Sequence, residues 1–375
     1  MTPRLCLGLL LVTFGMGGCG SPEASSLDAA ATESAVSDAP APAPPAEVRT
    51  VGSIERLSPS LDELIPPGAQ LEILAEGYEW SEGPVWVPEE AGRGFLLFSD
   101  VPQNTIHRWH PDEGASPWLH PSGFTGEGEP GREPGSNGLT LDGDGRLVLC
   151  QHGDRRLARL NAPFDAPAAD FETLADRHDG RRFNSPNDVA RHSSGAFYFT
   201  DPPYGLNEGE ADPARELDVM GVYRVAPSGE VTLLTGDLSR PNGLAFSPDE
   251  TILYVANSDP ERAIWMAYDV KDDGALEGTL ENGRIFFDAT PWVGERDGLP
   301  DGLKVAPSGH LFATGPGGVL IFHPEGEHLG TIQTTRATAN CAFGEEGRSL
   351  FITADDLLLR LRLAPESSAR GSGND

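Results

Sequence analysis

Short apolar runs recur along the chain from about residue 70 to residue 363. Examples are "GFLLFSD", "RLVLCQHG", "AFYFTD", "ILYVANSD" and "VLIFHP", and residues of the Gly, Pro, Asp and Asn types separate them. Such runs are typical of β-strands bounded by turns. The same region shows no helical period of useful length, so we predict an all-β fold.

A longer unit also repeats. Each copy has a small or polar opener, an acidic or amide residue, a short apolar strand, a Gly-bearing turn, a second strand and a polar exit. The copies align, at intervals of 55, 50, 55, 59 and 39 residues, on Gly83, Gly138, Asp188, Gly243, Gly302 and Cys341. Each interval is close to the length of four strands with their loops.

Six units of this kind predict a six-bladed β-propeller, in which four-stranded sheets surround a central channel. We expect the segment "AQLEILAEG", near residue 70, to complete the last blade. A pair of β-sandwiches is the main alternative, and the six similar openers argue against it.

The stretch "RPNGLAFSPDETILYVANSD", residues 240–259, places an Asn-Gly pair at the start of a strand. Asn-Gly usually forms a hairpin turn, because both residues tolerate positive φ. In a propeller, however, the openers begin the innermost strands and meet at one end of the channel. The opener residues at the equivalent positions are Glu82, Asn137, Asn187, Asn242 and Asp301.

Two carboxylates and several amide oxygens on one axis repel each other unless a cation lies among them. Oxygen ligands without a His or Cys set suit a hard divalent ion, which we expect to be a single Ca²⁺. Four rigid protein ligands are unusual for Mg²⁺, although Mg²⁺, Mn²⁺ and Zn²⁺ remain alternatives.

The composition limits the classes of partner. The 375 residues are 38% hydrophobic and 7% aromatic, enough for a sizeable core. The formal charge of -31, from 58 acidic and 27 basic residues, repels phosphate backbones and argues against nucleic-acid binding. Lys271 and Lys304 are the only lysines, and we interpret both as ordinary turn or strand residues without Schiff-base chemistry.

The N-terminus has the pattern of an export signal, residues 1–19. Arg4 precedes the apolar run "LCLGLLLVTF", which is too short to span a bilayer as a mature helix. The following "MGGCGS" resembles the cleavage box of bacterial lipoproteins, in which Cys19 would carry lipid. Met16 replaces the usual Leu of that box, so ordinary signal cleavage is the alternative.

The expected domain organisation follows from this signal. Residues 20–55 are rich in Ala, Pro and Ser and predict a disordered tether. We expect the six-bladed propeller domain at 56–365 and a flexible tail at 366–375. Export places the protein in a bacterial cell envelope, the periplasm or the outer membrane, with membrane contact only through the lipid anchor.

Four cysteines remain to be assigned. Cys6 would leave with the signal and Cys19 would carry lipid, which leaves Cys150 and Cys341 in a compartment that permits disulfides. Both lie in apolar strands of different repeats. We expect two buried free thiols, with a disulfide between them as the alternative.

Several motifs together resemble a known family. They are "EGPVW", "GSNGLTLD", "NSPNDV", "FTDPPYGL", "RPNGLAFSPD", "LYVANSD" and "PDGLKV", spread over residues 70–363. The chain is similar to the gluconolactonase, senescence-marker and luciferin-regenerating group of six-bladed propellers, and more distantly to the squid-type phosphofluoridate hydrolases. This resemblance implies a metal held by Glu82, Asn187, Asn242 and Asp301.

One position departs from the animal members of the family. Animal lactonases carry Arg two residues before the position of Asn187, where this chain has Ser185. Sugar-lactone specificity of the animal type is therefore in doubt, while "NSPND" is similar to the bacterial gluconolactonase branch. Some members use the position of Asn187 mainly for substrate.

The resemblance implies hydrolysis of a lactone such as gluconolactone. The metal would act as a Lewis acid on the ring carbonyl, and Asp301 would take the proton of the attacking water. The alternative is that Asp301 only holds the ion. We expect Asn137 and His152 to contact substrate, with blade-turn and loop-stabilising roles as their alternatives, and Asp201 and Tyr204 to support the site from the loop "TDPPYG".

Other enzyme classes leave no motif in the sequence. There is no G-x-S-x-G elbow, no H-E-x-x-H, no P-loop and no G-x-G-x-x-G following a strand. Hydrolysis of esters or organophosphates at the same site is one alternative, because fold and metal do not determine the substrate. A non-catalytic, calcium-stabilised binding propeller is another. We expect a small-molecule substrate and a monomer or small homo-oligomer.

Overall fold

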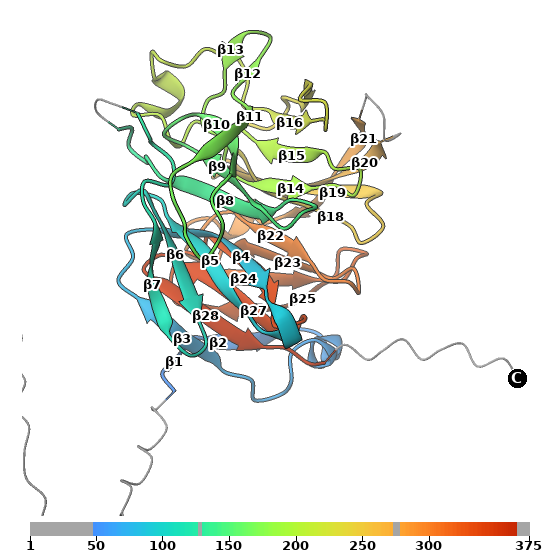
Figure 1. Ribbon diagram of the computed structural model, residues 1–375. Helices are drawn as coiled ribbons and strands as arrows, with labels where there is room; N and C mark the ends of the chain where they lie inside the picture. The colour runs from blue at the N-terminus through green and yellow to red at the C-terminus, as the bar shows by residue number, and fades with distance from the viewer. Residues whose placement is uncertain (1–47, 127–129, 273–277, 366–375) are drawn as a thin grey trace, which may run out of the picture. The chain divides into compact units, whose positions relative to one another are not determined.

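Antiparallel sheets follow one another along the chain and meet around a common centre (Figure 1). This computed structural model describes residues 48–126, 130–272 and 278–365. Within these ranges six sheets of four or five strands form the blades, which confirms the predicted all-β, six-bladed propeller. Helical structure there is limited to four short 3₁₀ segments: η1 (Pro59–Glu63), η2 (Glu90–Gly92), η3 (Gly209–Ala211) and η4 (Thr290–Trp292).

The first three blades are built from consecutive strands. The first contains β4 (Ser81–Pro88), β5 (Gly94–Asp100), β6 (Thr105–His110) and β7 (Gly114–Leu119). The second contains β8 (Ser136–Leu141), β9 (Leu147–Gln151), β10 (Arg156–Leu160) and β11 (Phe171–Ala175). A small hairpin, β12 (Arg177–His178) and β13 (Arg181–Arg182), precedes the third, which contains β14 (Val189–Arg191), β15 (Phe197–Thr200), β16 (Val222–Val225) and β17 (Val231–Thr235).

The fourth blade also has four consecutive strands, whereas the fifth and sixth blades each include strands from the N-terminal part of the chain. The fourth contains β18 (Pro241–Phe246), β19 (Ile252–Asp259), β20 (Arg262–Asp272) and β21 (Gly278–Asp288). The fifth contains β22 (Leu303–Val305), β23 (Leu311–Gly315), β24 (Gly318–Phe322), β25 (His328–Gln333) and β2 (Ser53–Arg56). The sixth contains β26 (Asn340–Gly344), β27 (Ser349–Ala354), β28 (Leu357–Arg362), β3 (Leu71–Glu76) and β1 (Thr50–Val51).

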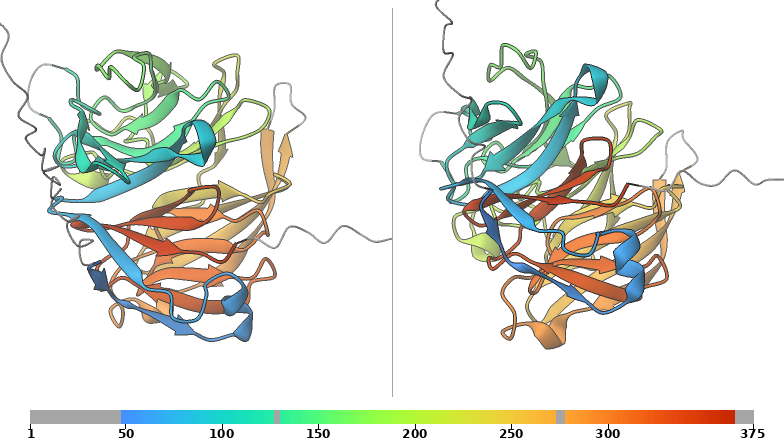
Figure 2. Two further views of the ribbon diagram at one scale, coloured as in Figure 1. Left: turned by 60° about the horizontal axis from the view of Figure 1, so that its bottom comes forward. Right: turned by 90° about the horizontal axis from the view of Figure 1, so that it is seen from below.

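The first strand of each blade lies innermost, and these strands contact one another in the order β4, β8, β14, β18, β22, β26 and back to β4. The ring closes because β3 pairs antiparallel with β28, with Leu71 opposite Leu361. Figure 2 shows this closure as N-terminal strands in blue beside C-terminal strands in red. The predicted use of "AQLEILAEG" to complete the last blade is therefore confirmed.

The prediction that the disordered tether extends to residue 55 was wrong. Residues 50–56 form β1 and β2, which pair with β3 and β25, so the fold begins before residue 56. The segment "TVGSIER" has only two large apolar residues, Val51 and Ile54, and its backbone groups pair with existing sheet edges. The expected signal, Cys19, the tether up to residue 47 and the tail at 366–375 lie outside the described residues.

The apolar core is divided among the interfaces between neighbouring blades. Each of six clusters joins two adjacent sheets; one, for example, packs Trp265 of the fourth blade against Phe322 of the fifth. Cys150 and Cys341 are buried in two different clusters and are free thiols, as expected. No helix in the described ranges is long and apolar enough to cross a membrane.

Candidate active site

The Asn-Gly opener of the fourth blade does not form a hairpin turn, because Pro241–Phe246 is the innermost strand β18. A Cβ on Gly243 would lie 2.3 Å from the carbonyl oxygen of Asp301 in the next blade. At Gly83, where φ is +51°, a Cβ would lie 2.0 Å from the carbonyl oxygen of Asn137. Glycine is thus required because neighbouring inner strands approach each other closely at the centre.

The strand pairing is also interrupted at these openers. The register between the first and second strands shifts between Glu82 and Val85, between Ser136 and Leu139, and between Pro241 and Leu244. Such β-bulges re-aim side chains and are common beside functional sites. Here the bulges leave residues of the openers outside the regular hydrogen-bond ladder between the first and second strands.

Hydroxyl groups where the second strands end hold the next opener in place. Ser99 donates to the carbonyl of Asn137 (2.9 Å), Thr200 to that of Asn242 (2.7 Å) and Thr314 to that of Ala339 (2.8 Å). The sequence pattern identified only a polar exit from each second strand. The structure shows that these residues link successive blades.

The three predicted amide residues form one chain of hydrogen bonds. Asn137 Nδ2 donates to Asn187 Oδ1 (2.9 Å), and Asn187 Nδ2 donates to Asn242 Oδ1 (2.5 Å). Asn242 Nδ2 in turn donates to the hydroxyl of Ser258 (2.9 Å). All three asparagines are buried, so side chains from three blades are fixed against one another. We call this set, from Asn137 to Ser258, the amide chain.

Two carboxylates share a pocket with the amide chain. The pocket has a volume of about 560 Å³, and Glu82, Asp301, Tyr204 and the three asparagines line it. Glu82 is 2% exposed and accepts a hydrogen bond from the N–H of Gly83 (2.9 Å). Within the described residues no donor reaches the enclosed Asp301 Oδ1 or Asn137 Oδ1.

Burial makes ionisation of these carboxyl groups costly. Burial and the nearby charge of Asp188 raise the pKa of Glu82 to about 8, although the Gly83 N–H opposes this. Burial, followed by the charges of Glu82 and Asp188, raises the pKa of Asp301 well above its usual range. Each of the two acids makes ionisation of the other less favourable, and oxygens without hydrogen-bond donors lie beside them. A bound cation would stabilise the ionised forms.

A further polar layer lies next to the amide chain. Asn340 Nδ2 donates to Asp188 Oδ2 (3.3 Å), and Lys304 Nζ donates to Asn340 Oδ1 (3.4 Å). Burial raises the pKa of Asp188, although the positive charge of Lys304 opposes the change. Lys304 lies in β22, as expected for a strand residue, but its contact with the central residues was not foreseen.

His152 follows β9 directly and is fully buried. Its Nε2 lies 3.1 Å from Asn187 Oδ1, and its Nδ1 lies 3.3 Å from Glu133 Oε2. His152 therefore contacts the amide chain, whereas Glu133 lines the pocket. Sequence reasoning missed Glu133, for which the only signal was an acidic residue shortly before the opener "GSNG".

Asp201 and Ser185 organise the loop that carries Tyr204. Asp201 accepts hydrogen bonds from the backbone N–H groups of Asn184 and Ser185, both at 2.8 Å. Ser185 Oγ donates to the carbonyl of Pro202 (2.6 Å) and accepts from the N–H of Gly205 (3.0 Å). Ser185, which occupies the position of the Arg in animal lactonases, thus connects two loops by hydrogen bonds. Tyr204 extends from one of these loops into the pocket.

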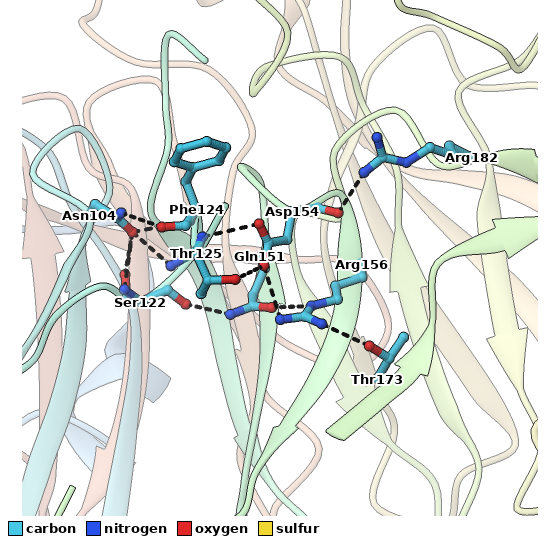
Figure 3. A network of polar contacts seen from close by, with 10 residues as sticks. Asn104, Ser122, Phe124, Thr125, Gln151, Asp154, Arg156, Thr173 and Arg182 are labelled. Carbon is cyan, nitrogen blue, oxygen red and sulfur yellow. Dashed lines mark hydrogen bonds and ion pairs between the residues drawn. The ribbon is translucent and has the colours of Figure 1, made fainter. Parts of the chain in front are cut away.

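A polar network next to the site secures the loop between the first and second blades (Figure 3). Asn104 Oδ1 accepts from the backbone N–H of Ser122 (3.0 Å), and Asp154 accepts from that of Thr125 (3.1 Å). Gln151 Nε2 donates to the carbonyl of Ser122 (2.8 Å), while Arg156 Nε donates to Gln151 Oε1 (2.5 Å). Gln151, the residue immediately before His152, is therefore fixed by hydrogen bonds to both Ser122 and Arg156.

Comparison with known proteins matches this architecture to one family. The SMP-30/gluconolactonase/LRE-like region matches residues 80–356, which include Glu82, the amide chain and Asp301. The chain belongs to this family. The resemblance predicted from the sequence motifs is thereby confirmed.

Two gluconolactonases and a pentonolactonase are similar to this SMP-30/gluconolactonase family member. The gluconolactonase of Zymomonas mobilis is 42% identical over 320 residues, which cover 84% of this chain and 86% of the relative. A gluconolactonase structure from Xanthomonas campestris has a TM-score of 0.69 and 31% identity, covering 84% of this chain and 97% of the other. A pentonolactonase of Haloferax volcanii is 26% identical and covers 72% of this chain and 80% of the relative.

Proposed function

We propose that this family member is a metal-dependent hydrolase that opens lactones, with a sugar lactone such as gluconolactone as its substrate. The observation that carries the proposal is the pairing of Glu82 and Asp301 with amide oxygens around one pocket. The gluconolactonase and pentonolactonase names of the relatives support the substrate class. The pocket volume is within the range of about 300–1,000 Å³ typical of small-molecule sites.

The residues present fit a divalent cation. The oxygens of Asp301 and Asn137 that lack donors in the described chain, together with the two mutually repelling acids, favour a positive charge among them. No group of three or more His, Cys, Asp or Glu side chains that could hold a metal occurs in the described ranges, so in this proposal amide oxygens complete the ligand set. Glu82, Asn187, Asn242 and Asp301 would hold the ion, and an all-oxygen set favours Ca²⁺.

When bound, the ion would polarise the ring carbonyl of the lactone and orient a water molecule. Asp301 would accept the proton of this water at a carboxylate oxygen that does not hold the ion. The water oxygen then bonds to the carbonyl carbon, the ring C–O bond breaks, and Asp301 returns the proton to the departing ring oxygen. Water and lactone are thereby converted to a hydroxy acid.

Other side chains would position the substrate in this scheme. Asn137 presents an amide oxygen without a donor in the described chain, which can accept a hydrogen bond from a sugar hydroxyl. Tyr204 contributes an aromatic wall that can pack on the ring. Together they would place the carbonyl carbon near Asp301 in a reactive orientation.

A substrate screen separates this proposal from hydrolysis of other esters at the same site. Sugar lactones, aryl esters and phosphotriesters would each be tested with Ca²⁺, Mg²⁺, Mn²⁺ and Zn²⁺. We expect the sugar lactones to give the highest kcat/KM. Faster turnover of phosphotriesters would replace the lactonase proposal, and no turnover of any substrate would favour a binding propeller.

Removal of the divalent ion should abolish turnover and lower the melting temperature. An ion that binds only the folded ring stabilises the fold by mass action, so its loss lowers the free energy of unfolding. The measurement compares activity and thermal melting before and after chelation, with re-addition of Ca²⁺ as the control. Full activity and unchanged melting in the chelated sample would contradict metal dependence.

A further inference from the structure

The hydroxyl of Tyr204 is an enclosed polar group without a hydrogen-bond partner among the described residues. Tyr204 lines the same pocket as Asp301 and Ser258. Ser258 has no proton to offer it, because the Ser258 hydroxyl donates to the carbonyl of Pro300. That hydroxyl makes its other contact as an acceptor, from Asn242 Nδ2 (2.9 Å). A buried hydroxyl left unpaired is unfavourable, so the pocket presents Tyr204 to a ligand that can pair with it.

The backbone on both sides of Tyr204 is fixed. Ser185 Oγ donates to the carbonyl of Pro202 (2.6 Å) and accepts from the N–H of Gly205 (3.0 Å), so one hydroxyl bridges the residues around Tyr204. A Cβ on Gly205 would lie 2.8 Å from the Cβ of Ser185, because the two loops pack closely. The rings of Pro202 and Pro203 fix φ at the two residues before Tyr204. The phenol is therefore held in the pocket in a preorganised position.

Tyr204 is available as a hydrogen-bond donor near neutral pH. Burial, followed by the negative charge of Asp301, raises the pKa of Tyr204 above its usual range, although Ser258 opposes the change. The phenol therefore keeps its proton. The effect of Asp301 on this pKa also means that the hydroxyl lies close to the carboxylate that, in the proposed function, takes a proton from water and returns it to the substrate.

The oxygens that change their bonding when water opens a lactone are those of the water, the carbonyl and the ring. A hydrogen bond donated to the attacking water would weaken it as a nucleophile, and in the proposed function the carbonyl faces the ion. The ring oxygen gains negative charge as its C–O bond breaks, and it must lie close to Asp301 to receive the proton. The Tyr204 hydroxyl lies on this side of the pocket, where a preorganised donor stabilises the developing charge.

We propose that Tyr204 is a catalytic residue whose hydroxyl donates a hydrogen bond to the departing ring oxygen of the lactone. This inference rests on the proposed function, in which Asp301 supplies the proton to that oxygen. Tyr204 keeps its own proton throughout, so the proton of the attacking water still passes to Asp301 and then to the ring oxygen. The hydrogen bond strengthens as charge builds on the ring oxygen, and it therefore favours the transition state over the bound substrate.

Tyr204→Phe removes the hydroxyl and keeps the aromatic ring. We expect kcat for gluconolactone to fall by roughly 10²-fold, the usual scale for loss of one donor to a developing charge. KM and the Ca²⁺ affinity measured by calorimetry should stay near the wild-type values, because the hydrogen bond forms mainly in the transition state. Tyr223→Phe is the matched control. The hydroxyl of Tyr223 is also enclosed and unpaired within the described ranges, but it lies in the core between the second and third blades.

The acidity of the departing oxygen gives a readout that a structural role would not move. The full-length wild type and both variants are compared on gluconolactone and on an analogue with a trifluoromethyl group in place of the hydroxymethyl group, which makes the ring oxygen a better leaving group. The loss in kcat for Tyr204→Phe should be much smaller with the analogue. Equal losses with both lactones, a raised KM with unchanged kcat, or behaviour like that of Tyr223→Phe would overturn the proposal. A wild type that opens neither lactone would overturn the proposed function instead.

Discussion

Asp301 combines an enclosed oxygen that has no donor in the described chain with several negative charges close by. Asp301→Asn would keep an oxygen for the ion but would remove a group able to accept a proton near neutral pH. We expect the rate to fall by roughly 10²-fold or more, the usual scale for a lost general base. The measurement is lactone hydrolysis across a metal titration, with binding followed separately by calorimetry.

Glu82→Gln is the matched comparison for Asp301→Asn. It should lose metal affinity first and regain part of its activity at high metal concentration, because Glu82 holds the ion without transferring a proton. Full rescue of Asp301→Asn by excess metal would eliminate the role of Asp301 as a base.

Asp201 should make stability depend on pH. Burial raises its pKa from 3.8 to about 7, despite hydrogen bonds from Asn184 and Ser185 and the charge of Arg155. The folded state therefore binds the proton more tightly than the unfolded state, and this stabilisation is lost as pH rises from about 4 to about 7. Asp201→Asn is always neutral and should gain stability relative to the wild type over this window, by up to roughly 4 kcal/mol.

This difference is measured by denaturant unfolding of both proteins from pH 4.5 to pH 8. Comparison at each pH cancels the titration of groups that the two proteins share. A constant difference in unfolding free energy across the range would show that Asp201 ionises in the folded protein as it does in the unfolded chain.

The N-terminal strands close the ring of blades. β3 covers the edge of β28, and Leu61, Ile65 and Leu71 fill the cluster between the fifth and sixth blades. Removal of residues 1–76 would expose this strand edge and its apolar neighbours. We expect the shortened protein to aggregate and to lose its cooperative thermal transition.

Removal of residues 1–47 provides the control, because it leaves every described strand in place. Thermal melting and gel filtration of the two shortened chains should differ sharply. A cooperative, monodisperse protein lacking residues 1–76 would show that β3 is dispensable for closure.

We propose that this protein resides at a bacterial envelope and that Cys19 anchors it there. Cys19→Ala should release the protein from the envelope fraction, since the apolar run before it is too short to remain as a membrane span. The measurement is fractionation of cells that express each form, with Cys150→Ala as a matched control at a buried thiol. Unchanged membrane association of Cys19→Ala would exclude a lipid anchor at that residue.

The propeller could be predicted because its signals are local and repeated. Strand-length apolar runs and Gly-bearing turns recur along the chain, and the repeat places one opener at the start of each innermost strand. Because a closed ring brings those openers to one axis, the convergence of Glu82, the amide chain and Asp301 followed from topology. The boundary at residues 50–56 escaped prediction because edge strands depend on the sheet they join.

The partners of the central side chains depended on the folded geometry. Glu133 meets His152, Lys304 meets Asn340, and Ser185 ties down the loop of Tyr204. These contacts join different blades or loops, and they depend on side-chain direction and on the distance between packed sheets. Local hydrophobic periodicity contains no information on side-chain direction or on the distance between sheets. Repetition along the chain therefore determines which residues form the central ring, whereas packing between blades determines the contacts of each residue.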